Sequence, residues 1–157
     1  MGHLRGQTVS MQELTPVIAE VLEKGGSVEL TVTGNSMRPM LWDRESRVRL
    51  AAPERLRRGD IPLYRRRDGT YVLHRIVAVE NEGAYTCCGD NQWRLEPGVR
   101  ERQVAAAVTD FTWRGRWVSC ASPLYGLYWR SWVALRPVRR LIFGGLRRLW
   151  RVCGRNQ

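Results

Sequence analysis

The sequence predicts a mainly β domain with a helix before it and basic amphipathic helices after it. Three observations support this fold class. A hydrophobic period of two recurs in short segments across residues 27–120, with Gly, Asn and Asp turns between them. A helical period precedes these segments, and the charge pattern changes after Asp110. At 157 residues the chain has the size of one packed core. We therefore divide it into an N-terminal helix (1–26), a β domain (27–120) and a basic, Trp- and Arg-rich helical tail (121–157).

The first predicted element is an amphipathic helix over residues 10–24. Ser10 and Glu13 match a capping box, in which each side chain satisfies a backbone N–H group at the start of the helix. Gly25-Gly26 ends the element. Its apolar positions recur at helical spacing: Leu14, Val17, Ile18, Val21 and Leu22.

Short strands joined by close turns follow the helix. Asp68-Gly69 is a strong hairpin signal, because both residue types accept the backbone angles of a tight turn. Asn81-Glu82-Gly83 marks a second turn. The predicted strands cover residues 28–32, 48–50, 61–66, 70–79, 84–88 and 103–111. This pattern favours a compact β-rich domain with few helices.

The tail that follows Asp110 is strongly basic. The chain carries 26 Lys and Arg against 15 Asp and Glu, and ten arginines but no acidic residue follow Asp110. From Pro137 onward, Arg140, Arg147 and Arg151 lie opposite an apolar face, as in a basic amphipathic helix. Three partners suit such a tail. It can pack on the β domain with its arginines solvated, bind an anionic membrane surface, or bind nucleic acid, although no recognised nucleic-acid-binding motif is present.

The cysteines predict neither a disulfide framework nor a metal site. Cys87 and Cys88 are adjacent, Cys120 and Cys153 stand apart, and no CxxC or Cys/His spacing occurs. We expect reduced thiols in a cytoplasmic protein that contacts the membrane peripherally through its tail, and we expect no cofactor. The N-terminal segment is interrupted by polar residues, and no apolar run reaches about 18 residues, so we expect neither a signal peptide nor a membrane span.

Few side chains in this sequence can act as a base at neutral pH. Arginine stays protonated, and Lys24, the one lysine, falls in the predicted N-terminal helix. Of the two histidines, His3 lies close to the N-terminus, whereas His74 falls inside the predicted strand 70–79 on a face shared with aliphatic residues. His74 is therefore the expected general base. The alternative is a core histidine that is hydrogen-bonded to the backbone.

Ser36 and Asp90 complete the predicted catalytic set. Ser36 follows Gly34-Asn35 at the end of a predicted strand, where a hydroxyl can attack a carbonyl and nearby backbone N–H groups can bind the oxyanion. Asp90 lies in a Gly-Asp-Asn turn, where its carboxylate could orient an imidazole in a Ser-His-Asp arrangement. Each of the two segments is also compatible with an ordinary turn.

Four motifs, taken together, resemble the type I signal peptidases and the wider LexA-like serine peptidases. They occur in that family's order over about residues 27–110. The motifs are Gly34-Asn35-Ser36-Met37-Arg38-Pro39, similar to the nucleophile motif; Arg58-Gly59-Asp60-Ile61-Pro62-Leu63-Tyr64, similar to the Arg-Gly-Asp strand; His74-Arg75-Ile76-Val77, similar to the motif with the base; and Gly89-Asp90-Asn91, similar to the closing motif. The chain looks like a compact member without an N-terminal membrane anchor.

The resemblance implies a LexA- or signal-peptidase-like β fold and a serine endopeptidase that cleaves a peptide or a precursor protein. By position, Ser36 matches the nucleophile and Asp90 the acidic residue. His74 stands where bacterial relatives have lysine and where eukaryotic secretory and archaeal relatives have histidine. Ser36, Asn35 and Met37 are then expected at the oxyanion and substrate-binding position. The alternative is a catalytically weak, peptidase-like scaffold that binds a membrane or a nucleic acid.

Overall fold

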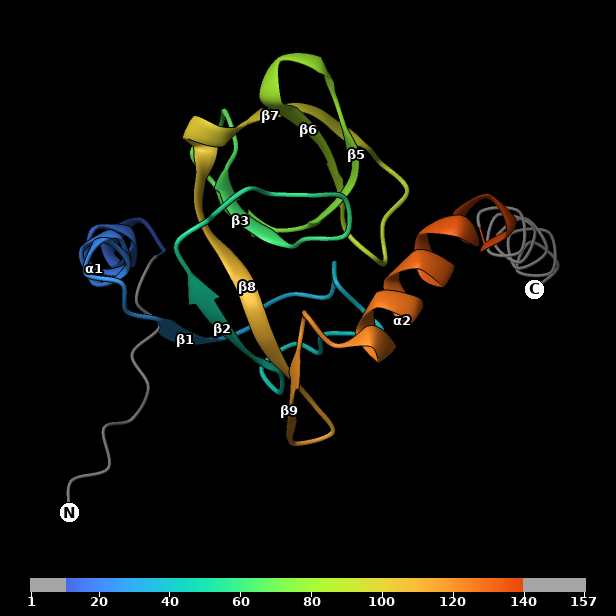
Figure 1. Ribbon diagram of the computed structural model, residues 1–157, viewed down its shortest axis with the longest axis horizontal. Helices are drawn as coiled ribbons and strands as arrows, with labels where there is room; N and C mark the ends of the chain where they lie inside the picture. The colour runs from blue at the N-terminus through green and yellow to red at the C-terminus, as the bar shows by residue number, and fades with distance from the viewer. Residues whose placement is uncertain (1–10, 140–157) are drawn as a thin grey trace, which may run out of the picture.

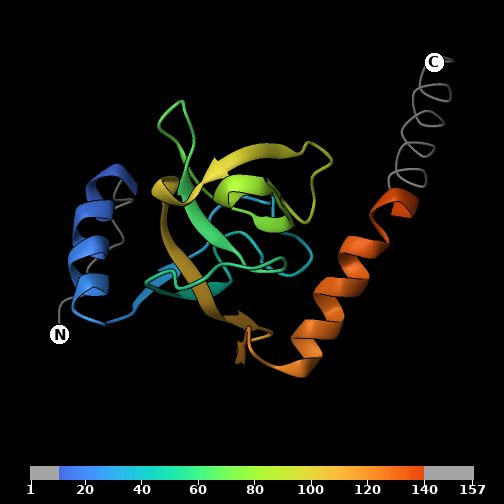
Figure 2. The ribbon, with the colours of Figure 1, turned by 45° about the horizontal axis from the view of Figure 1, so that its top comes forward.

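The computed structural model describes residues 11–139 and confirms the predicted fold class, a mainly β protein with helices before and after the strands (Figure 1). Helices α1 and α2 lie on opposite sides of the β domain (Figures 1 and 2). The elements are α1 (Met11–Glu23), β1 (Val28–Thr31), β2 (Arg47–Ala51), β3 (Pro62–Arg65), β4 (Tyr71–Leu73), β5 (Arg75–Val79), the 3-10 helix η1 (Asn81–Gly83), β6 (Ala84–Cys88), β7 (Glu96–Arg100), the 3-10 helix η2 (Glu101–Gln103), β8 (Val104–Trp113), β9 (Arg116–Ser119) and α2 (Pro123–Ala134).

The larger of the two sheets is antiparallel and six-stranded. Its strands follow the order β1-β2-β8-β3-β4, and β9 pairs with the far end of β8. The pairing register shifts between Arg49 and Leu50 and again between Leu63 and Tyr64, and such irregularities bend a sheet. The sheet is curled (Figure 1). Strands β1 and β4 are edge strands of this sheet, and neither pairs with a further described strand.

The second sheet holds three strands in the order β5-β6-β7. The chain passes from the larger sheet into this one at His74, since β4 ends at Leu73 and β5 begins at Arg75. The sequence predicted one continuous strand over residues 70–79, and that prediction is wrong at this point. A continuous strand turns neighbouring side chains to opposite faces. Here His74 and Arg75 are both buried, and the backbone leaves one ladder to join another.

The main core lies between α1 and the larger sheet, and it confirms the amphipathic helix predicted for residues 10–24. Ile18 and Leu22 of α1 are buried in it. Met37 and Leu41, which follow the predicted nucleophile, belong to the same core. The segment that carries Ser36 is thus anchored by apolar side chains on its inner side.

Strand β7 was not predicted from the sequence. It contains Pro97 and Gly98, which are depleted in strands and weaken the local signal. It forms because β6 offers a paired partner, with Tyr85 opposite Val99 and both side chains buried. Tertiary context has overridden local propensity here.

Helix α2 confirms that the first part of the tail is helical and packs on the β domain. The Ser122 hydroxyl caps the helix by accepting a hydrogen bond from the Tyr125 backbone N–H at 3.2 Å. Trp129 packs on Gly59, where an added Cβ atom would come within 2.4 Å of the indole ring. The predicted amphipathic segment from Pro137 onward lies mostly outside the described residues.

Candidate active site

Three of the four sequence motifs meet at Arg75, whose side chain is 0% exposed. Its guanidinium binds Asp90 at both carboxylate oxygens, with N–O distances of 2.8 and 2.6 Å. It also donates to the Gly59 carbonyl at 3.0 Å and to the Tyr125 hydroxyl at 2.6 Å. Burial opposes the charge of Arg75, but the bonds to Asp90 and Tyr125 outweigh it and raise the pKa above the ordinary value. Arg75 therefore stays charged at the centre of the site.

The loop that carries Ser36 is fastened to the Gly-Asp-Asn turn. The Asn91 backbone N–H donates to the Ser36 carbonyl at 2.8 Å, and the Asn91 side chain donates to the Asn35 carbonyl at 3.2 Å. The turn approaches so closely that a Cβ atom on Gly89 would lie 2.7 Å from the Ser36 carbonyl oxygen. Glycine at this position permits the contact. The nucleophile motif and the closing motif thus form one unit.

The predicted oxyanion residues fall into different surroundings. The backbone N–H of Ser36 donates to none of the described residues, so it can serve as an oxyanion donor. Asn35 is exposed beside it, and its side chain makes no hydrogen bond to a described residue. Met37 is buried in the core and lines the groove beside Ser36. Its side chain belongs to the packing of the loop.

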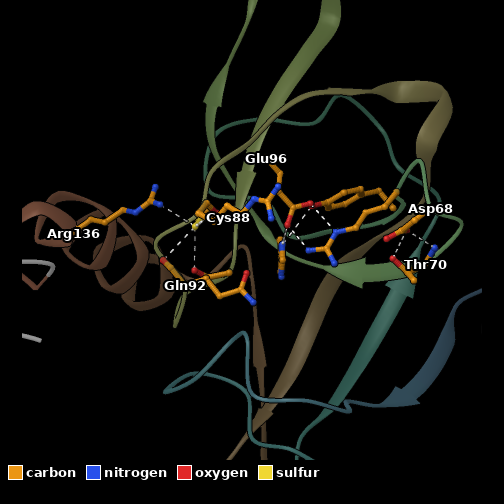
Figure 3. A network of polar contacts seen from close by, with 11 residues as sticks. Asp68, Thr70, Cys88, Gln92, Glu96 and Arg136 are labelled. Atoms are coloured by element: carbon orange, nitrogen blue, oxygen red, sulfur yellow. Dashed lines mark hydrogen bonds and ion pairs between the residues drawn. The ribbon is translucent and has the colours of Figure 1, made fainter. Parts of the chain in front are cut away.

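His74 is 1% exposed, and its Nδ1 atom faces a carboxylate. The Nδ1 atom lies 3.2 Å from a carboxylate oxygen of Glu96 and 3.3 Å from the Tyr64 hydroxyl. Glu96 in turn accepts hydrogen bonds from the Tyr64 hydroxyl and the Arg66 Nε, each at 2.8 Å. Glu96 lies at the centre of this polar network (Figure 3). Because the carboxylate can only accept, Nδ1 carries the ring proton and Nε2 holds the lone pair that a general base needs.

The electrostatics of this network keep His74 neutral at pH 7. Burial lowers the pKa of His74 below its ordinary value of 6.5, and the Glu96 charge opposes that shift without reversing it. Burial also acts to raise the pKa of Glu96, but hydrogen bonds from Arg66 and Tyr64 outweigh it and lower that pKa. The site therefore holds an ionised carboxylate beside an imidazole in its basic form.

Asp90, predicted to orient His74, does not do so in the structure. It is paired with Arg75. In the β5–β6 ladder Arg75 lies opposite Cys88, and Cys88 is two residues before Asp90 in the chain. A bidentate bond to a guanidinium is stronger than a bond to a neutral imidazole, so the carboxylate turns to Arg75. Glu96 occupies the position predicted for Asp90. Sequence reasoning missed Glu96, which belongs to none of the four motifs.

Ser36 lines a groove that ends at Leu73, the residue before His74. His74 is not among the residues that line this groove, and no hydrogen bond joins the Ser36 and His74 side chains. The groove has a volume of about 130 Å³ and lies between the two edges of the larger sheet. On one side it is lined by Thr31, Val32, Thr33 and Ser36, at and after β1, and on the other by Tyr71, Val72 and Leu73 of β4. Leu73 directly precedes His74. The structure thus brings the predicted nucleophile to the strand that leads into the predicted base.

Helix α2 and the residues after it hold the loop formed by residues 89–94. The Trp132 indole N–H and an Arg139 guanidinium N–H donate to the Asp90 carbonyl at 3.1 and 3.2 Å. Arg136 donates to the Trp93 carbonyl at 2.7 Å and to the Cys88 sulfur at 3.0 Å. Figure 3 shows Arg136 reaching from its helix toward Cys88. The tail therefore supports the loop that fastens Ser36.

Comparison of the chain with protein-family models, with curated proteins and with solved structures finds no match. Within residues 11–139, no helix has the length and apolar character needed to cross a membrane. In the same part of the chain, no three His, Cys, Asp or Glu side chains cluster as metal ligands would.

Proposed function

We propose that this protein is a serine endopeptidase of the signal-peptidase-like type, in which Ser36 is the nucleophile and His74 the general base. The observation that carries the proposal is the placement of Ser36 in a groove between two open sheet edges, one of which leads directly into His74. The imidazole already has the proton arrangement of a base, because Glu96 holds Nδ1. In this proposal Glu96, in place of Asp90, orients the ring.

The groove suits an extended peptide as substrate. Strands β1 and β4 each have one side without a described partner, so their backbone groups are available to a peptide that adds as a further strand. The lining is largely aliphatic, with Leu30, Val32 and Leu63 among its residues. A volume of about 130 Å³ has room for one side chain. We therefore propose cleavage next to an apolar residue.

The reaction follows from these positions. The Ser36 hydroxyl attacks the peptide carbonyl while its proton passes to His74 Nε2, and the backbone N–H of Ser36 binds the oxyanion. Imidazolium His74 then protonates the leaving amine, which departs and leaves an ester on Ser36. A water molecule gives a proton to His74 and attacks the ester. His74 then returns that proton to the Ser36 oxygen as the ester bond breaks, which releases the second product and restores the enzyme. Because the Ser36 and His74 side chains are not hydrogen-bonded, substrate binding has to draw them together, as occurs in many enzymes.

A fluorophosphonate probe tests this proposal directly, since it reacts with activated serine hydroxyls. We expect labelling at Ser36, loss of labelling and of peptide hydrolysis in Ser36→Ala, and unchanged labelling in Ser131→Ala, which alters an exposed serine on α2. Circular dichroism establishes that both variants fold. Labelling of neither the natural chain nor the control would favour the alternative, a peptidase-like scaffold that only binds its partner. Equal hydrolysis by Ser36→Ala would refute the nucleophile.

A further inference from the structure

Helix α2 and the turn after it present an apolar stripe on the side turned away from the β domain. This outer stripe consists of Leu124, Leu127, Leu135 and Val138, which are 80%, 64%, 51% and 48% exposed. At 3.6 residues per turn these four positions fall on one side of a helix. Tyr125 and Gly126, on the opposite side, are buried. Large aliphatic side chains in such a row are unusual on a surface that faces water.

The outer stripe continues onto the β domain through an apolar groove. The groove has a volume of about 300 Å³, and it is lined by Met40, Phe111, Trp113, Val118, Leu124, Tyr125 and Tyr128. Trp113 is exposed at its rim, and Trp117 is exposed on the neighbouring strand β9. Tryptophan is favoured where an apolar phase meets water, because the indole is largely apolar but keeps one N–H donor. The surface therefore combines aliphatic residues with aromatic ones that suit an interface.

The charge around this surface selects the kind of partner. The net charge of the chain is +11, and all of the residues after Asp110 contribute ten arginines and no acidic group. A second copy of the chain would bring the same positive charge to the interface and be repelled. A nucleic acid would engage the arginines but leave the leucines in water. An anionic lipid surface accommodates both, because its phosphates attract arginine and its acyl region accepts leucine.

We propose that the outer stripe docks on an anionic bilayer, with Leu124 and Leu127 below the headgroups and the neighbouring arginines at the phosphates. The helix lies on the membrane, and no described helix crosses it. Arg130 is placed for such a role, since its guanidinium stacks over the Trp129 ring at 4.8 Å on the flank of the stripe. Docking does not require Ser36 to be catalytic, so it can fail or hold independently of the peptidase activity.

Vesicle co-sedimentation of the full chain tests the proposal. The vesicles contain phosphatidylcholine and phosphatidylglycerol in equal parts, or phosphatidylcholine alone. The test variant replaces Leu124 and Leu127 by aspartate. The matched control is Val17→Asp, which puts the same residue at a 58% exposed apolar position of α1, on the far side of the domain. We expect the natural chain and the control to bind the anionic vesicles, and the double variant to bind at least about tenfold more weakly.

Four results would overturn the proposal. Equal binding by the double variant would show that the arginines act without the outer stripe. Equal binding to vesicles with and without phosphatidylglycerol would remove the role of charge. A dimer of the natural chain that becomes a monomer in the double variant, measured by light scattering, would show that a second copy covers the stripe. Loss of binding in the Val17→Asp control would also count against it, because the effect would then not be specific to α2.

Discussion

Replacing Asp90 by asparagine tests which of two roles this carboxylate has: neutralising the buried Arg75 or orienting His74. In the structure Asp90 neutralises Arg75, which is 0% exposed. When the Asp90 charge is removed, Arg75 loses two charge-assisted hydrogen bonds of 2.8 and 2.6 Å. Breaking a buried ion pair on one side leaves a buried charge without its counter-ion, at a cost of about 3–5 kcal/mol. For a chain of this length we expect Asp90→Asn to lower the melting temperature by about 10 °C.

Urea denaturation and differential scanning calorimetry measure this effect. The matched control is Glu20→Gln, which makes the same carboxylate-to-amide change on the surface of α1. Glu20 forms an ion pair with Lys24 whose N–O distance is similar, 2.7 Å. An exposed pair of this kind contributes at most about 1 kcal/mol, so the control should melt close to the natural protein. If Asp90→Asn melts like the control and only hydrolysis falls, Asp90 orients His74 after all, and the role assigned to Arg75 is wrong.

Three further predictions concern the site. The rate of probe labelling at Ser36 should rise with pH as His74 loses its proton. The midpoint should lie below pH 6.5, because burial lowers the pKa of His74. A midpoint at or above pH 6.5 would contradict the buried position of His74. Glu96→Gln should slow labelling of Ser36 by at least about 100-fold. It should also move the midpoint of the pH profile to still lower pH, since the carboxylate raises the pKa of His74. Labelling reactions that are quenched at timed intervals across a pH series measure both effects. Arg136→Ala should speed amide hydrogen exchange in residues 89–94 by at least about tenfold, read by mass spectrometry, because the bond to the Trp93 carbonyl in this loop and the bond to Cys88 directly before it are lost. Unchanged exchange would mean that Arg136 does not restrain the loop.

The sequence was sufficient to predict the fold class. The hydrophobic periods identify α1 and most strands, and the turn at Asn81-Glu82-Gly83 is where η1 forms. The motifs with Ser36 and His74 were found because each contains several unusual residues in a fixed order. The structure places Ser36 in a groove that is also lined by Leu73, the residue before His74. The roles of Ser36 and His74 in catalysis stay predictions.

The partners of His74 could not be read from the sequence. Glu96 reaches the ring because β7 pairs with β6, where Glu96 lies opposite Cys87, and Cys87 in turn lies opposite Ile76 of β5. Such a contact depends on two strand registers, which local patterns do not determine. The burial of both His74 and Arg75 could not be read from the sequence for a related reason. Strict alternation puts neighbouring side chains on opposite faces, whereas the chain changes sheets at His74.

The central position of Arg75 has a consequence for how the site opens. Desolvation of its guanidinium is unfavourable unless its hydrogen-bond partners are already in place. These partners are Gly59, Asp90 and Tyr125, which are far apart in the chain. Losing any one of these contacts weakens the others, so the three segments should unfold together as one cooperative unit. Local unfolding of the loop that carries Ser36 is then suppressed. Under the proposed function, this would protect the enzyme from cleaving itself.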